Sequence, residues 1–441
     1  MKLKKFLFSP IDHSPVTLWR IVFGLVMVFE CFGAILVGWT KQVFIDPPKF
    51  TFNFIGFEWL QPLSGNGMYV YFGLMGCLAI MVTLGYRYRF AMVILTIGWM
   101  GLYFMHKTSY NNHHYLMLLL SLMMTLTPAN INLSLDAKYG IVKRQSTLPQ
   151  IFKWQFLLLF LVVYVYASIA KWYPDWTSGI VSSNMLGHKK SIPIIGWIYS
   201  LKYTPIVVAW GGILYDLLVI PLLLWKPTRK FAFVISIGFH LFNSITFQIG
   251  TFPYMMIGAS VLFFPPATLH KFFRLKPSDT SSTLEYTPKR KSLMTYGFAL
   301  FFVWQILLPL RHFAIPGWVY WTEEGHKLSW RMMLRSKSGN IGFRILGADG
   351  KQIYHDVHGD LTKDQYRTMS THPDMIWQYC QYLKTVYGND IEIYVNSYVS
   401  LNMHKHQRLI DPNVDMAKAK WHRFKHEDWI LPYDFDIQEN E

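Results

Sequence analysis

Residues 154–176 read WQFLLLFLVVYVYASIAKWYPDW, an almost unbroken apolar run that ends at Ala170 and is followed directly by Lys171. Such a run approaches the roughly 20 apolar residues that a helix needs to cross a bilayer. The lysine amine is therefore expected where a membrane helix meets its polar rim. A lysine acts as a base near neutral pH only when its pKa lies well below the free value of about 10.4, and apolar surroundings favour the uncharged amine. The alternative is a lysine that extends to the interface, as many do at the ends of membrane helices.

The whole chain has the composition of an integral membrane protein. Of its 441 residues, 52% are hydrophobic, 17% are aromatic and only 15% are charged. Nine apolar stretches approach or exceed the length of a span, so we expect nine membrane helices, with a margin of one because the third, fourth and eighth are short. They lie at about 15–39, 68–86, 89–105, 113–128, 154–171, 205–225, 231–249, 251–265 and 293–311.

The basic residues predict the orientation of these helices. The net charge of +16 does not indicate a nucleic-acid partner, because lysine and arginine concentrate in every second connection, as at 2–5, 87–89 and 226–230. This asymmetry is typical of cytoplasmic loops. We therefore expect a cytoplasmic N-terminus, a first span retained as an anchor, and a periplasmic or luminal C-terminal domain. The membrane would be the inner or plasma membrane of a bacterium, or the endoplasmic reticulum of a eukaryote.

The composition changes after Leu310, and no further spanning stretch follows. We expect an all-α transmembrane bundle at 1–312 that carries the catalytic site, followed by a smaller extramembrane α+β domain at 313–441. In this domain, 329–335 and 341–346 are predicted strands joined by a turn at 338–340. Pro373 suits the first turn of a helix that Gly388 ends, and alternation predicts a strand over 391–401.

Polar side chains near the hydrocarbon are costly, so a search for function begins with them. Four polar clusters stand out, and the charge pattern places all four on the outer side of the membrane. They are KTSYNNHHY at 107–115, KWYPDW at 171–176, FHLFNS at 239–244 followed by QIGTFPY at 248–254, and RHF at 311–313.

Each cluster also has a structural explanation. Asn112 and His113 can cap a helix, and His312 can be an ordinary interfacial histidine. The polar residues His240, Asn243 and Ser244 recur at helical spacing and can bond across helices. Arg20 and Asp216 lie within spans, where they can neutralise each other or bond backbone groups.

A catalytic metal is the rival chemical interpretation, and we do not expect one. Membrane di-iron enzymes use several tight histidine boxes with the imidazoles on one helical face. In this chain His113 and His114 are adjacent, and His404 and His406 have strand spacing. The three cysteines exclude a disulfide framework.

The polar clusters resemble the vitamin K-dependent gamma-glutamyl carboxylase family and its bacterial relatives, the horizontally transferred transmembrane domain proteins. Residues 107–116 resemble the family's Lys-Thr-Ser-Trp-Asn-Asn-His segment, and Ala170–Lys171 with Asp175–Trp176 resemble the segment of its essential lysine. Residues 239–252 match another family stretch almost position for position. Trp321–Thr322, Ser329–Trp330, Met332–Met333 and 408–415 resemble the family's outer domain, so the likeness covers nearly the whole chain.

The resemblance implies a vitamin K-dependent gamma-glutamyl carboxylase. Its cofactor would be vitamin K hydroquinone, a reduced naphthoquinone, with O2 and CO2 as co-substrates. Lys171 would deprotonate the quinol, whose oxidation to the epoxide yields a strong base. That base removes a γ proton from a glutamyl side chain of a peptide or protein, and the carbanion adds CO2. His113 is implied in the carbanion stage.

Further site residues follow from the same resemblance. Asn112, His240, Asn243 and His312 are implied at the quinol site. The region that binds the glutamyl substrate is implied at Trp321, Trp330 and Met332. In that region the sequence departs from the family pattern, with His326 at the place of a tyrosine and Arg335 at the place of a histidine.

Two other functions remain open from the sequence. One is a quinol-epoxidising membrane oxygenase that carboxylates no protein, and the other is a non-catalytic transporter or lipid-binding protein. Many transporters show duplicated halves, and this sequence has no internal repeat. A carbanion survives only where water cannot quench it. A carboxylase would therefore need an apolar, closed cavity that a lipidic quinol can reach from the membrane.

Overall fold

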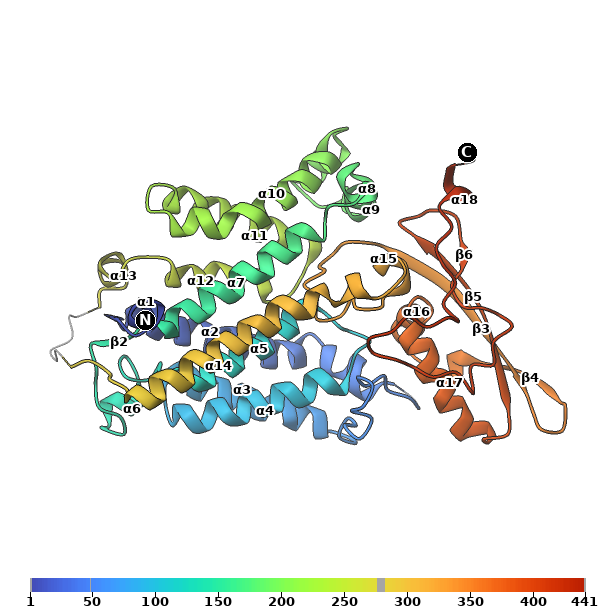
Figure 1. Cartoon of the computed structure of the whole chain (residues 1–441), viewed down its shortest axis with the longest axis horizontal. Helices are drawn as coiled ribbons and strands as arrows, with labels where there is room; N and C mark the ends of the chain where they lie inside the picture. The colour runs from blue at the N-terminus through green and yellow to red at the C-terminus, as the bar shows by residue number, and fades with distance from the viewer. Residues whose placement is uncertain (1, 48, 276–281, 440–441) are drawn as a thin grey trace.

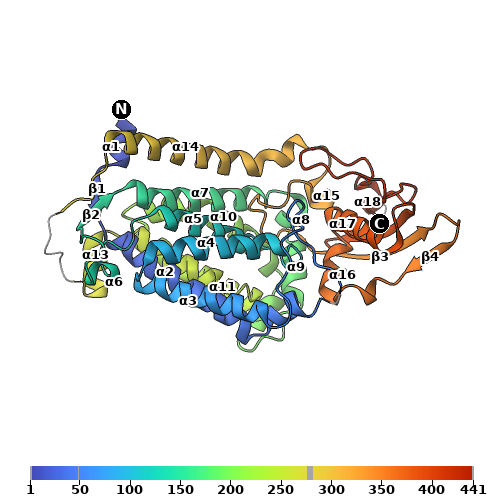
Figure 2. The ribbon, with the colours of Figure 1, turned by 90° about the horizontal axis from the view of Figure 1, so that it is seen from below.

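The computed structural model describes residues 2–47, 49–275 and 282–439, and it consists of a long helical bundle with a smaller sheet-containing domain at one end (Figures 1 and 2). The N-terminus lies at the opposite end of the bundle from this domain (Figure 1). The predicted fold class, an α-helical membrane bundle followed by an α+β domain, is confirmed.

Seven helices in the described part of the chain are long and apolar enough to cross a membrane. They are α2 (Ser14–Leu36), α3 (Gly67–Leu84), α4 (Tyr88–Met105), α7 (Ile151–Ile169), α10 (Thr204–Leu224), α11 (Arg229–Phe247) and the segment Pro288–Ala314, which comprises α14 (Pro288–Leu310) and η4 (Arg311–Ala314). Two shorter segments form an eighth span if they are counted together. The first is Phe252–Leu262, which contains α12 (Phe252–Ala259) and η3 (Ser260–Leu262), and the second is α13 (Pro266–Phe273).

The difference from the predicted nine lies in two of the segments that are short in sequence. The fourth predicted span is α5 (Asn112–Leu126), which has only 15 residues but lies among the long helices (Figure 1). The eighth is bent by 118° at the break between Leu262 and Pro266. Pro266 begins α13, because proline lacks an N–H donor and is tolerated in the first turn of a helix.

Small residues let the first two long helices approach each other. A Cβ on Gly76 of α3 would lie 2.5 Å from the ring of Phe32 in α2. Such close contacts are typical of membrane helices, which pack without a hydrophobic driving force.

Arg20 of α2 is fully buried and donates to the carbonyl oxygens of Ala129 (3.1 Å) and Leu133 (2.6 Å), so it bonds backbone groups and not Asp216.

The outer domain, as we call the part after α14, contains an antiparallel sheet of order β4-β3-β5-β6. Its strands are β3 (Lys337–Leu346), β4 (Gln352–His355), β5 (Glu392–Leu401) and β6 (Gln407–Arg408), and its longer helices are α16 (Lys363–Met369) and α17 (Pro373–Tyr387). The predicted helix from Pro373 and the strand that ends at Leu401 are confirmed.

The predicted strand at 329–335 and the turn at 338–340 are wrong. β3 runs through 338–340, and the chain turns after β3, at 347–350, where the pattern of residues 348–350 also predicts a turn. Leu328, Trp330 and Met333 have left-handed backbone, with φ of 62°, 56° and 50°, which a strand does not allow. Contacts with the bundle hold this segment, since the Trp330 ring stacks on Tyr115 at 4.8 Å.

Short elements complete the chain. They are α1 (Lys2–Leu7), β1 (Pro10–Asp12), η1 (Lys41–Ile45), α6 (Leu135–Lys138), β2 (Thr147–Pro149), α8 (Pro174–Thr177), α9 (Ile180–Gly187), η2 (Gly196–Ser200), α15 (Val319–Thr322), η5 (Val357–Gly359) and α18 (Asp436–Glu439). β1 pairs with β2, at the end of the bundle away from the outer domain (Figure 2).

Candidate functional site

Two cavities meet where the bundle joins the outer domain. The larger has a volume of about 820 Å³ and the smaller about 430 Å³. We call them the basic cavity and the apolar cavity after their linings. Five residues belong to both linings: His113, Ile249, Phe252, Met332 and Met333. A group bound in one cavity is therefore separated from the other by a single layer of side chains.

Lys171 lines the apolar cavity and is only 7% exposed. α7 ends just before Lys171, and the Nζ of Lys171 turns back to donate to the carbonyl oxygen of Ala167 at 3.0 Å. The same atom lies 2.6 Å from Oδ2 of Asp216 in α10 and 5.6 Å from the centre of the Trp176 ring. The amine is thus held inside the protein, against a carboxylate and an indole.

Two further polar side chains of the apolar cavity, His240 and Asn243, come from α11. His240 is 1% exposed, and its Nε2 lies 3.0 Å from the Tyr164 hydroxyl and 3.1 Å from the Tyr215 hydroxyl. Its Nδ1 has no hydrogen-bond partner among the described residues. Asn243, almost one turn further, also lines the cavity, and its amide makes no hydrogen bond within the described part of the chain. Two polar groups are therefore available to a ligand beside aromatic walls.

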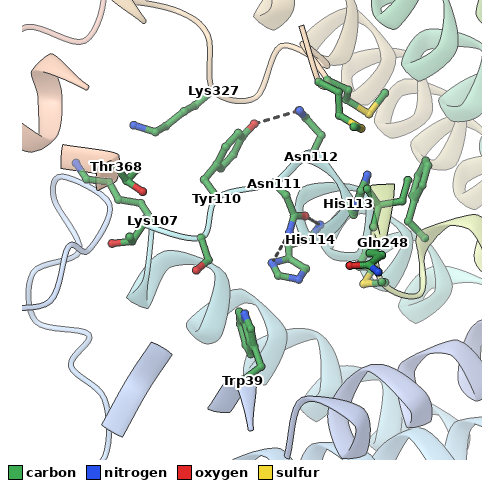
Figure 3. Close-up of a pocket in the computed structure, with 18 of the residues that line it drawn as sticks. Trp39, Lys107, Tyr110, Asn111, Asn112, His113, His114, Gln248, Lys327 and Thr368 are labelled. Carbon is green, nitrogen blue, oxygen red and sulfur yellow. Dashed lines mark hydrogen bonds between the residues drawn. The ribbon is translucent and has the colours of Figure 1, made fainter. Parts of the chain in front are cut away.

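His113 stands in the wall between the cavities. Its ring stacks on Phe252 at 4.1 Å with an interplanar angle of 12°. The cap of α5 is Asn111, whose side chain accepts from the N–H of His114 at 2.8 Å, so neither Asn112 nor His113 is needed as a cap. Figure 3 shows His113 and Gln248 on one side of the basic cavity, with Lys107, Lys327 and Thr368 across it.

Asn112 lines the basic cavity and fixes the segment that follows Trp330. Its Nδ2 donates to the carbonyl oxygen of Arg331 at 3.0 Å, and its Oδ1 accepts from the Tyr110 hydroxyl at 3.1 Å (Figure 3). The side chain thereby links the start of α5 to segment 328–333, which also carries Met332 and Met333 of the shared wall.

Cationic side chains dominate the basic cavity. Its lining contains Lys107, Lys327, Arg331, Arg335, Lys337 and Arg367. Among the described residues that line it, Glu30 is the only one with a carboxylate. Such a charge distribution attracts an anionic ligand and holds it at the cationic side.

Two buried carboxylates behind this lining keep the cations in place. Asp374, at the start of α17, pairs with Lys107 at 2.8 Å and with Lys327 at 2.6 Å. Burial opposes the charge of Asp374, but Lys107 and Lys327 outweigh it and hold its pKa well below the usual value. Burial lowers the pKa of Lys107 to about 8, against the attraction of Asp374. Lys107 precedes α5, so this contact joins the bundle to the outer domain.

Glu323 is the second of these buried carboxylates. It pairs with Arg335 and, at 3.0 Å, with Lys337. Burial opposes its ionisation, yet Arg335 and Lys337 hold its pKa well below the usual range. Burial lowers the pKa of Lys337 to about 8. The cations are therefore positioned before any ligand arrives.

Glu30 and Asp216 were not predicted as site residues. Glu30 of α2 accepts from Thr251 Oγ1 at 2.5 Å and lies 3.2 Å from His114 Nε2, so it joins α2, α5 and the start of α12. Asp216 was expected to pair with Arg20 or to bond backbone, and it binds Lys171 instead. Each is a carboxylate within an apolar span, and that sequence signal could have identified both as candidates.

Three of the sequence-predicted site residues lie outside both linings. Nδ1 of His312 lies 2.7 Å from the Pro309 carbonyl oxygen, and its Nε2 lies 3.3 Å from a guanidinium nitrogen of Arg331. Trp321 and Trp330 are fully buried, and the Trp321 indole donates to the Leu431 carbonyl oxygen. No group of three or more His, Cys, Asp or Glu residues in the described chain is arranged to hold a metal ion.

Two family comparisons cover most of the sequence. The HTTM domain family matches residues 8–267, more than half of the chain. The family described as vitamin K-dependent gamma-carboxylase, lumenal domain, matches residues 290–436, which include α14 and the outer domain. No solved structure matches the chain.

Proposed function

The chain belongs to the vitamin K-dependent gamma-carboxylase family, and from this premise we propose that it carboxylates glutamyl side chains with CO2, driven by the oxidation of vitamin K hydroquinone to its epoxide with O2. The observation that carries the proposal is the wall shared by the two cavities. A strong base formed in the apolar cavity needs to reach only across this wall to a glutamyl group in the basic cavity.

The apolar cavity fits a naphthoquinol in its chemistry. Such a ligand has a flat apolar ring system with two polar oxygens, and bound there it supplies the reaction with O2 that yields the strong base. Aromatic side chains line the cavity, and the free Nδ1 of His240 and the amide of Asn243 offer polar contacts. A buried polar atom without a partner is rare in proteins, which supports a ligand at this place.

Lys171 is the base in this proposal, and Asp216 makes that role chemically consistent. An ammonium group cannot accept a proton, so the amine must first be uncharged. Asp216 Oδ2, 2.6 Å away, can take the lysine proton, which leaves a neutral amine beside a neutral acid. Lys171 then holds the proton that it receives from the quinol hydroxyl.

The basic cavity would bind the glutamyl carboxylate. Charge-assisted bonds from arginine and lysine are the strongest that a carboxylate can accept. Glu30 repels a second carboxylate from its own side of the cavity, which directs the substrate carboxylate toward the cations. His113, with Phe252 and Met332, faces the γ carbon in this arrangement, and the apolar wall keeps water from the carbanion.

One experiment tests the proposal. Purified protein in nanodiscs receives reduced naphthoquinone, O2, labelled bicarbonate and a glutamate-rich peptide, and epoxide and incorporated label are measured separately. We expect both products. Epoxide without label would favour a quinol-epoxidising oxygenase, and neither product would favour a non-catalytic membrane protein.

We also propose that the N-terminus is cytoplasmic and that the outer domain faces the periplasm or lumen. The alternating lysine and arginine content of the connections supports this orientation. A membrane-impermeant thiol reagent applied from outside should label a cysteine placed at Asn340 of β3 and not one placed at Lys289 at the start of α14. The reverse pattern would contradict the orientation.

A further inference from the structure

The segment 170–176, which carries Lys171, is held by the outer domain. α7 ends at Ile169, just before this segment, so the regular hydrogen bonds of the helix do not continue through it. Tyr320 of α15 donates its hydroxyl to the first carbonyl oxygen of the segment, and its ring stacks on Tyr173 at 4.1 Å. The place of the segment at the end of the bundle therefore depends on contacts with the outer domain.

Asn402, which follows β5 directly, joins this segment to the wall of the basic cavity. Its Nδ2 donates to Oδ2 of Asp175 at 2.7 Å, and the residue is only 2% exposed. Its backbone N–H donates to the Ser336 carbonyl oxygen at 2.7 Å, and its Oδ1 accepts from the Ser336 N–H at 2.9 Å. Ser336 lies between Arg335 and Lys337, two cations of the basic cavity. One buried side chain thus connects the two regions.

The turn that presents this amide has an unusual backbone. Asn402 and Met403 are both left-handed, with φ of 52° and 68°. Residues other than glycine rarely adopt this conformation, although asparagine and aspartate tolerate it. Such a backbone persists where surrounding contacts fix it. The three bonds of Asn402 to Asp175 and Ser336 supply that constraint, so the turn holds the amide in one place.

Asp175 passes this contact on to the lysine. Its Oδ2 also lies 3.1 Å from Nε2 of His404, so two outer-domain side chains bind the same oxygen. The next residue is Trp176, whose ring centre lies 5.6 Å from Nζ of Lys171 and whose indole donates to the Ala209 carbonyl oxygen at 3.0 Å. A displacement of Asp175 therefore moves an aromatic wall against the amine.

We infer that Asn402 is a positioning residue for the proton transfer from the quinol, because its amide, through Asp175, sets the place of Lys171 in the apolar cavity. The inference rests on the proposed function, in which Lys171 is the base, and adds that the outer domain takes part in the quinol stage. Asn402 is not among the residues that line either cavity, so it acts only through the segment. Displacement of a reacting group by about 1 Å is enough to slow catalysis strongly.

Two glycine variants test the positioning role. Asn402→Gly and Met403→Gly each place glycine where φ is positive, which suits the backbone, but only Asn402→Gly removes the amide that binds Asp175. Met403 is 76% exposed, so it is the matched control. We expect the epoxide kcat of Asn402→Gly to fall about tenfold or more, while the KM for the quinol changes less than about twofold. Met403→Gly should keep the kcat of the wild type. Equal kcat values in the two variants would overturn the inference.

An exchange of partners separates positioning from folding. Asn402→Asp places two carboxylates side by side, whereas the double variant Asn402→Asp with Asp175→Asn again has one donor and one acceptor. Aspartate also tolerates the left-handed backbone. We expect a low epoxide kcat in Asn402→Asp and recovery of most of the loss in the double variant, as coupled partners show. No loss in the single variant, or no recovery in the double variant, would contradict the role of Asn402.

Amine labelling tests the place of Lys171 without turnover. Protein in nanodiscs reacts briefly with formaldehyde and a mild hydride donor, and mass spectrometry compares methylation of Lys171 with that of Lys202, an exposed internal standard. Asn402→Gly should speed the labelling of Lys171 several-fold, and Met403→Gly should leave it unchanged. If labelling responds in this way but the wild type forms no epoxide, Asn402 positions the lysine and the proposed function falls. If epoxide forms and labelling is the same in both variants, the positioning role alone falls.

Discussion

Nζ of Lys171 lies 2.6 Å from Oδ2 of Asp216, and both side chains are less than a tenth exposed. The pair joins the end of α7 to α10 inside the apolar cavity. Removing two charges from water is costly, and the cost is recovered only while both partners are present. This one contact therefore affects both the stability of the bundle and the position of the lysine amine in the cavity.

The pair should show strong thermodynamic coupling. Lys171→Met leaves Asp216 without its partner, and Asp216→Leu leaves Lys171 without its carboxylate. We expect each single change to lower the free energy of unfolding by about 3–5 kcal/mol, and the double variant to recover most of that loss. Thermal unfolding of the four proteins in one detergent measures the cycle. Additive losses in the double variant would contradict the coupling.

Lys171→Ala should abolish both epoxide and incorporated label, because both products depend on the first proton transfer. Loss of a positioned general base typically lowers a rate by about 10²–10⁴-fold. Asp216→Asn keeps the size of the side chain but cannot take up the lysine proton, so epoxide formation should also fall. An active Lys171→Ala protein would refute the assignment of the base.

His113→Ala should separate the two products. His113 belongs to the wall between the cavities, whereas Lys171 and Asp216 line the apolar cavity alone, so epoxide should persist while label drops strongly. The comparison is His312→Ala, because His312 lies outside both cavity linings. This variant should still form both epoxide and labelled peptide. Parallel loss of epoxide and label in His113→Ala would argue against a role restricted to carboxylation.

Arg335→Gln should raise KM for the glutamyl peptide by about tenfold, since one charge-assisted hydrogen bond contributes about 1.5–3 kcal/mol. Epoxide formation at saturating peptide should change much less. Arg344→Gln is the control, because Arg344 lies over the Tyr394 ring in the outer domain and lines neither cavity. A similar change in KM for both variants would show that only overall charge matters.

The contact of Asp374 with Lys107 and Lys327 should make stability dependent on acidity. The folded pKa of Asp374 lies well below the unfolded value of about 3.9, so the unfolded chain binds the proton first as pH falls. Its contribution is therefore complete above the unfolded pKa and is lost as pH falls from about 4 toward the folded pKa. The stability difference between wild type and Asp374→Asn, measured by unfolding at pH 7, 5 and 3, should shrink at the lowest pH. A constant difference would contradict this assignment.

The sequence predicted the elements whose cause is local. Long apolar runs such as 154–170 form helices wherever they meet lipid, because backbone groups in lipid must bond within the segment. The prediction failed at 329–335, where a strand was expected. Trp330 packs on Tyr115 of the distant α5 there, and that contact imposes a left-handed backbone that no local pattern contains.

The candidate site divides in the same way. Lys171, His113 and His240 are recognisable in the sequence, because polar residues beside apolar runs stand out. The partner of Lys171 is not recognisable in the sequence, because Asp216 lies 45 residues further along the chain. The sequence was equally compatible with a contact between Asp216 and Arg20 or backbone groups.

The amino-acid sequence by itself determined a membrane bundle with an outer domain and a family resemblance that includes the lysine, because hydropathy and motif spacing are properties of short segments. Only the tertiary structure decided that Asp216 binds Lys171 and that His113 stands between two cavities. The physical reason is that burial, pairing of charges and the shape of a cavity depend on how distant helices pack, and packing is a property of the whole chain.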